Sequence, residues 1–176
     1  MEQNRNANLF SEGNIRIRGK RRNIIHFLQE ELIPVYELQN NQVEERRLKI
    51  EESSGGWGLT LRREEDTSDN VYFKGSDKYW IGTDTHTIGV IFSNGRNTNS
   101  DQVICLDNFV CPWSPDFKFF QKKAMEHRVD IRMFTWDKQA WSSIFTWYRN
   151  GDIEETDRKY EDFVWDCPYP DVYGVC

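Results

Sequence analysis

The chain has 176 residues, a formal net charge of −6 and a hydrophobic content of 38%. Aromatic residues make up 14% of the sequence, which argues against a disordered chain. No stretch approaches the roughly 18 apolar residues of a membrane-spanning helix. We therefore predict a single folded domain over residues 1–176, a length typical of one domain.

The N-terminus and the cysteines indicate a cytoplasmic protein. Residues 1–8 are polar and lack the apolar core of a signal peptide. Cys105 and Cys111 lie six positions apart and Cys167 and Cys176 nine apart, so neither pair has the close spacing of zinc ligands. We expect four reduced thiols, no metal site and no cofactor.

The first predicted elements are a strand and a helix. Two isoleucines alternate with two arginines over residues 14–18, which is the period of a half-buried strand. Apolar residues then recur at helical spacing over residues 23–32, and Pro34 marks the end of that helix. In this helix Glu30 and Glu31 are expected to face outward.

The middle of the chain predicts short strands and two excursions. Residues 37–54 are charged and have no clean period, so we expect a surface excursion or a short helix. Residues 64–101 are expected to be a β-rich insertion. The predicted strands are Trp57–Arg62, Val71–Lys74 and Thr87–Phe92.

The second half predicts a strand, a helix and a hairpin. The strand covers residues 102–107, and the helix covers 116–126 with Ser114 as N-cap and Pro115 at its first position. Residues 129–149 are expected to form an antiparallel hairpin. This order predicts an α+β sandwich with helices on one face of a mostly antiparallel sheet.

Tryptophan is frequent, with seven residues, while aliphatic residues are few. We therefore expect tryptophans to supply much of the core, and one or two exposed ones would serve as interface anchors. The tryptophans expected in the core are Trp80, Trp136, Trp141, Trp147 and Trp165.

The segments 103–106 and 111–115 (Cys-Pro-Trp-Ser-Pro), with the following helix and hairpin, resemble a known family. It is a ferredoxin-like family of unknown function carried by bacteriophages and plasmids. Residues 13–19 and Gly56-Trp57-Gly58 are also similar to it. The resemblance implies a ferredoxin-like sandwich with two main helices on one face and a mobile-element setting. Inhibitors of host defence nucleases, including anti-CRISPR proteins, are common in that setting. The resemblance implies no catalytic residues.

Charge is concentrated at the C-terminus, where residues 150–176 form an acidic-aromatic segment with two basic and eight acidic residues. One interpretation is a solvated strip, and the other is a surface that docks on a basic, nucleic-acid-binding protein. The candidate partner-binding residues are Glu154, Glu155, Asp157, Glu161, Asp162 and Trp165.

A basic segment lies near the other end of the chain. Its five cations, Arg16, Arg18, Lys20, Arg21 and Arg22, are candidates for contacting the phosphates of RNA. The alternative is that they pair with the acidic C-terminal segment of the same chain.

One residue pair offers candidate catalytic chemistry. If residues 83–88 are extended, Asp84 and His86 share a face, and a carboxylate beside an imidazole can make a general base. A ribonuclease could use this pair, while the alternative is a polar, solvated face of an edge strand.

Three functions remain open at this level. The preferred one is a non-enzymatic inhibitor that binds a host defence effector, alone or with its guide RNA. The second is a ribonuclease that cleaves a guide or other RNA. The third is a housekeeping protein of a phage or plasmid.

Overall fold

The computed structural model describes residues 10–37, 42–95, 97, 99–112, 115–136 and 142–156. Over these residues the chain has two helices and twelve strands. In chain order they are β1 (Phe10–Gly19), α1 (Arg21–Glu31), β2 (Leu32–Glu37), β3 (Val43–Glu45), β4 (Lys49–Glu52), β5 (Gly58–Arg62), β6 (Asn70–Phe73), β7 (Trp80–Gly82), β8 (Thr87–Ile91), β9 (Gln102–Pro112), α2 (Phe117–His127), β10 (Asp130–Trp136), β11 (Ser142–Trp147) and β12 (Ile153–Thr156).

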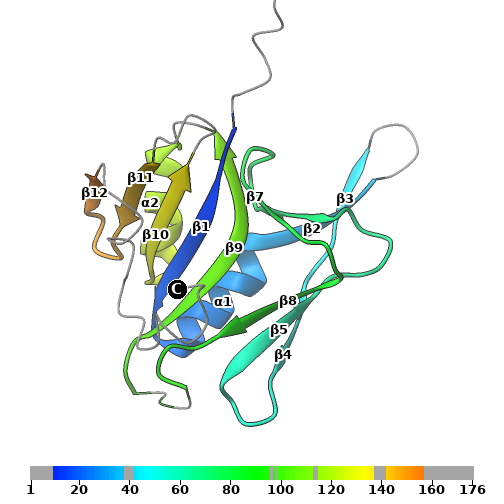
Figure 1. The fold of residues 1–176 in the computed structure, drawn as a ribbon, viewed down its shortest axis with the longest axis horizontal. Helices are drawn as coiled ribbons and strands as arrows, with labels where there is room; N and C mark the ends of the chain where they lie inside the picture. Colours follow the sequence, from blue (N-terminus) through cyan, green and yellow to red (C-terminus); the bar gives the residue numbers. More distant parts are fainter. Residues whose placement is uncertain are drawn as a thin grey trace, which may run out of the picture.

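Nine strands form one sheet in the order β12-β11-β10-β1-β9-β7-β6-β2-β3. The other three form a smaller sheet, β4-β5-β8. Neighbouring strands in both sheets are antiparallel. Figure 1 shows both helices behind the large sheet, with the smaller sheet at the lower right, next to α1. The predicted α+β class with a mostly antiparallel sheet is confirmed.

β1 is an inner strand of the large sheet, between β10 and β9. Its Ile15 and Ile17 are fully buried in the same cluster as Phe27 of α1. Between Gly13 and Ile15 the register against β9 shifts. Asn108 on β9 has a φ of 55° at this bulge, a conformation that asparagine tolerates better than most residues.

Helix α2 begins later than the sequence predicts. The N-cap is Asp116, whose side chain accepts hydrogen bonds from the backbone N–H groups of Lys118 and Phe119. The prediction of Ser114 as N-cap with Pro115 at the first helical position is therefore wrong, and Ser114 lies outside the described residues. A carboxylate satisfies two of the unpaired N–H groups at a helix start. The predicted hairpin is confirmed as β10 and β11.

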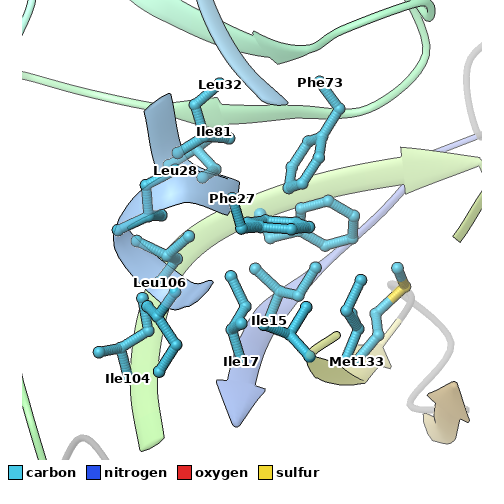
Figure 2. Packing of buried hydrophobic residues seen from close by; sticks show 14 of the residues in the cluster. Ile15, Ile17, Phe27, Leu28, Leu32, Phe73, Ile81, Ile104, Leu106 and Met133 are labelled. Carbon is cyan, nitrogen blue, oxygen red and sulfur yellow. The ribbon is translucent and has the colours of Figure 1, made fainter. Parts of the chain in front are cut away.

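The core combines aliphatic side chains with a group of packed aromatic rings. Figure 2 shows Phe27 and Phe73 among the isoleucines and leucines of α1, β1 and β9. The ring of Phe120 lies 5.7 Å from that of Phe73 and 4.9 Å from that of Trp147. Among the described tryptophans, Trp147 is fully buried as expected, whereas Trp80 is only partly buried. The side chains of Trp136, Trp141 and Trp165 lie outside the described residues.

The two predicted excursions consist of strands where they are described. Residues 37–54 contain β3 and β4 rather than a helix. Residues 64–101 contribute β6 and β7 to the large sheet and β8 to the smaller one. The middle of the chain therefore extends the main sheet as well as adding a second one.

Candidate functional site

The basic segment predicted to contact nucleic acid divides between two places. Arg16 and Arg18 belong to β1, whereas Lys20, Arg21 and Arg22 lie at the start of α1. Arg16 is 1% exposed, so its guanidinium is not presented to a phosphate from solution. Arg22 is exposed. The five cations therefore do not form one continuous surface.

Arg18 takes part in an ion cluster around Asp130. The carboxylate of Asp130 accepts hydrogen bonds from Arg18 Nε at 3.0 Å and from Arg149 Nη2 at 2.7 Å. Burial alone would raise the pKa of Asp130, but the hydrogen bonds from Arg149 and Arg18 outweigh burial and lower it. This cluster joins β1, β10 and the turn after β11.

We expect Asp130→Asn to lower the free energy of unfolding by about 2–3 kcal/mol at neutral pH, because two guanidinium groups lose a charged acceptor. The side chain of Arg149 is 31% exposed, which keeps the loss below that of a fully buried pair. Since the folded pKa of Asp130 lies below its unfolded value, this stability is present above about pH 4 and is lost as pH falls through the folded pKa. Urea unfolding of both proteins between about pH 7 and pH 2 measures the difference, which should shrink with acid. A difference that stays constant over that range would contradict the expectation.

Arg21 has a structural role. It is 8% exposed, and its guanidinium donates to Gly56 O at 2.7 Å and pairs with Glu52 at 3.1 Å. The same guanidinium lies 4.2 Å from the ring centre of Phe92. Arg21 thus fixes α1 to the smaller sheet and to the loop after it.

A surface pocket of about 630 Å³ lies over this junction. Lys20, Arg21 and Arg22 line it, and Glu52 and Asn99 also border it. Lys20 donates to Asn99 O at 2.6 Å and lies 3.5 Å from Asp101. The pocket is therefore lined by three cations, and two of them, Lys20 and Arg21, already pair with neighbouring groups.

The predicted catalytic pair is not brought together. Thr83–Ile88 is not one strand, because β7 ends at Gly82 and β8 begins at Thr87. Asp84 and His86 are both exposed, and no hydrogen bond joins these two described residues. Asp84 borders a hollow of about 270 Å³ beside Gly13, and His86 does not line this hollow. The geometry of a carboxylate–imidazole base is absent at this pair.

The candidate partner-binding residues begin on β12, at one edge of the large sheet. Glu154 and Glu155 are exposed, and they pair in register with Thr146 and Phe145 of β11. Since side chains alternate along a strand, the two carboxylates project to opposite faces. Tyr148 donates its hydroxyl to Glu154 at 2.8 Å. The other four candidates, Asp157, Glu161, Asp162 and Trp165, lie outside the described residues.

The edge strand is held in place by α2. Gln121 donates its side-chain amide to Gly151 O at 2.6 Å, at the turn that leads into β12. Gly151 has a φ of 94°, which favours glycine at this turn. Over the described residues β12 pairs with β11 alone and is the last strand at this edge of the large sheet.

The sequence did not predict a buried polar network between the two helices. Glu31 of α1 accepts a hydrogen bond from Lys123 Nζ and contacts His127 Nε2 at 2.7 Å. His127 Nδ1 lies 3.1 Å from Nδ1 of His26. Lys123 also donates to Lys74 O at 2.9 Å. Four charged or titratable side chains thus join α1 to α2.

The prediction that Glu31 faces outward is wrong, because Glu31 is 6% exposed. Burial alone would raise its pKa, but the hydrogen bonds with His127 and Lys123 outweigh burial and lower it, so the carboxylate is ionised near neutral pH. Glu31 and Lys123 are 92 residues apart, and each by itself is typical of a solvated helix face. The sequence offered one signal of this buried network, namely a histidine, His127, directly after the predicted helix 116–126.

The Cys111 thiol is not suited to nucleophilic chemistry or to binding a metal ion. The Cys105 thiol donates to Asp107 Oδ1 at 3.6 Å, and burial raises the pKa of the Cys111 thiol to about 12. A thiol with that pKa stays protonated at neutral pH and is a poor nucleophile and ligand. In the described part of the chain, no group of three or more His, Cys, Asp or Glu residues could hold a metal ion.

No protein-family model, curated protein or solved structure matches this chain. None of the helices in the described ranges is long and apolar enough to cross a membrane.

Proposed function

We propose that the protein is a mobile-element-encoded inhibitor of the anti-CRISPR type. It acts in the host cytoplasm, binds a nucleic-acid-binding defence effector, and blocks nucleic-acid loading or cleavage. The observation that carries this proposal is the acidic strand β12 at the edge of the described sheet, where Glu154 and Glu155 are exposed and project to opposite faces.

The strand order supports the ferredoxin-like part of the proposal. β9, α2 and β10 follow one another in the chain, and β9 and β10 flank β1 in the sheet. This is the split βαβ arrangement of ferredoxin-like folds. Both helices lie on the same side of that sheet in Figure 1.

The charge distribution fits a basic partner. Residues 150–176 carry a net charge of −6, equal to that of the whole chain, and β12 holds the start of this segment on an ordered strand. Carboxylates fixed on a rigid edge attract a basic groove and compete with the phosphates that the groove normally binds. Strand pairing with the partner along this edge can add backbone hydrogen bonds.

We expect Glu154→Lys/Glu155→Lys to weaken inhibition of the effector at least tenfold, because each substitution replaces an attractive charge with a repulsive one. The measurement is a titration of nuclease activity against inhibitor concentration, with purified guide-RNA-dependent nucleases as a panel. Wild-type protein should inhibit stoichiometrically. A higher salt concentration should weaken inhibition by the wild-type protein. It should also reduce the difference in inhibition between the wild type and the variant.

Glu65→Lys/Asp66→Lys is the matched control. It changes charge by the same amount at two exposed residues in the turn between β5 and β6, away from β12 in the sheet order. Equal inhibition by wild type and by the β12 variant would refute the docking surface. Capture of a partner from host lysate, with and without nuclease treatment, separates a protein partner from RNA.

The ribonuclease alternative gains no support from the separate positions of Asp84 and His86. It would require RNA cleavage with multiple turnover by the purified chain, abolished in His86→Ala. The housekeeping alternative would be favoured if no nuclease of the panel is inhibited and no defence effector is captured.

A further inference from the structure

The pocket at the junction of α1 and the smaller sheet has a positively charged lining. Among the described residues, three cations, Lys20, Arg21 and Arg22, and one carboxylate, that of Glu52, line it. Its volume of about 630 Å³ lies within the range of about 300–1,000 Å³ that is typical of small-ligand sites. Both its charge and its size suit one anionic group with a small part of the molecule that carries it.

The three cations differ in how firmly they are held. Arg21 is fixed by Glu52 and by a backbone carbonyl, so it supplies a positive charge at a set position. Lys20 pairs with Asp101 at 3.5 Å, and both side chains are partly exposed, so this pair is weak. Arg22 is exposed, and its guanidinium forms no ion pair or hydrogen bond with any described residue. Arg22 is therefore the cation that can turn most readily towards a ligand.

An exposed tryptophan lies next to this pocket. Trp57 is 57% exposed and directly follows Gly56, which lines the pocket. A Cβ at Gly95 would lie 2.4 Å from the ring of Trp57, so the ring lies against Gly95. Arg21 Nη1 approaches the carbonyl oxygen of the same Gly95 at 3.5 Å. The indole is thus held near the pocket cations while more than half of the residue's surface stays open to solvent.

We propose that this pocket binds a phosphate of single-stranded nucleic acid, with the adjacent base stacked on Trp57. Arg22 and Lys20 donate hydrogen bonds to the phosphate oxygens, and Arg21 adds a fixed charge. Proteins that bind single strands combine cations for the backbone with aromatic rings for the bases. Inorganic phosphate would use the cations but not the indole, so the exposed ring favours a nucleic acid as the ligand.

The test is a titration of labelled poly(U) RNA or poly(dT) DNA of about ten nucleotides with the full chain, followed by fluorescence anisotropy. We expect both probes to bind at about 50 mM salt, with a slope of log K against log salt of about −1.4 for two phosphate contacts. Arg22→Ala should weaken binding about tenfold and bring the slope to about −0.7. Because Arg22 is exposed, this variant leaves the core intact.

Arg47→Ala is the matched control for the loss of one positive charge. Arg47 is exposed and precedes β4, whereas Glu52, which lines the pocket, is the last residue of β4. Arg47→Ala should bind both probes like the wild type. Trp57→Ala should weaken binding at least about fivefold because the stacking surface is lost, and Trp57→Phe should keep most of the affinity.

The assay contains no defence effector, so it is independent of the docking surface proposed on β12. Glu154→Lys/Glu155→Lys should bind both probes at least as tightly as the wild type, whether or not that variant still inhibits a nuclease. Failure of either probe to bind by about 1 mM protein would overturn the proposal, as would wild-type affinity in Arg22→Ala or in Trp57→Ala. Inorganic phosphate that competes as well as the nucleic acid would also overturn it and leave an anion site.

Discussion

Trp147→Ala is expected to lower the free energy of unfolding by about 3–5 kcal/mol, the usual range for removing a large aromatic residue from a core. Trp147 is 0% exposed. Its ring lies 4.9 Å from that of Phe120 and 5.9 Å from that of Phe117, so it fills the space between β11 and α2. Alanine would leave a cavity there that the two rigid elements can close only in part. Urea unfolding followed by circular dichroism measures the loss.

Trp147→Phe provides the control. The indole Nε1 of Trp147 is buried, and no described residue accepts a hydrogen bond from it. Phenylalanine removes that unpaired donor and keeps most of the apolar surface, so we expect less than half of the loss seen with alanine. If both variants lower the free energy of unfolding by the same amount, the ring contacts with α2 are not the source of the stability.

Gly13→Ala should destabilise the protein by at least about 3 kcal/mol, the upper part of the range for overpacking. A Cβ at Gly13 would overlap the carbonyl oxygen of Phe134 and lie 2.9 Å from its carbonyl carbon. Both are backbone atoms of β10, so the clash is relieved only by separating β1 from β10. The measurement is the midpoint of thermal or urea unfolding.

Gly89→Ala is the control for this prediction. Gly89 lies on β8, and a Cβ there would meet no atom within 4 Å. We expect a neutral or slightly stabilising effect, since alanine restricts the unfolded chain more than glycine does. A Gly13→Ala variant as stable as Gly89→Ala would show that β1 and β10 can separate at no cost.

Local periodicity predicted β1, α1, β5, β9 and the β10–β11 hairpin because each carries its apolar pattern within a few residues. β12 was not predicted, since its four residues, Ile153–Thr156, include two glutamates and pair only after β11 is in place. The α2 start was misplaced because Ser114, Pro115 and Asp116 all resemble the beginning of a helix. Only the folded chain shows which of them satisfies the N–H groups.

The surroundings of the candidate site residues could be predicted less well than the strands and helices, because their partners are distant in the chain. Arg21 looked like a phosphate ligand in sequence, but its partners Glu52, Gly56 and Phe92 come from another sheet and its loops. Glu31 looked solvated, although Lys123 and His127 bury it. Local sequence reports the chemistry of a side chain, while its neighbours are set by the assembly of elements that are distant in the chain.

The inner position of β1 has a consequence for biosynthesis. Ile15 pairs with Leu106 on one side and with Met133 on the other, so β1 can pair only after strands much later in the chain have been synthesised. Pairings this distant in sequence slow folding and leave apolar strands uncovered in the meantime. We expect the nascent chain to recruit chaperones until β10 has emerged, and to aggregate when translation is truncated before that point.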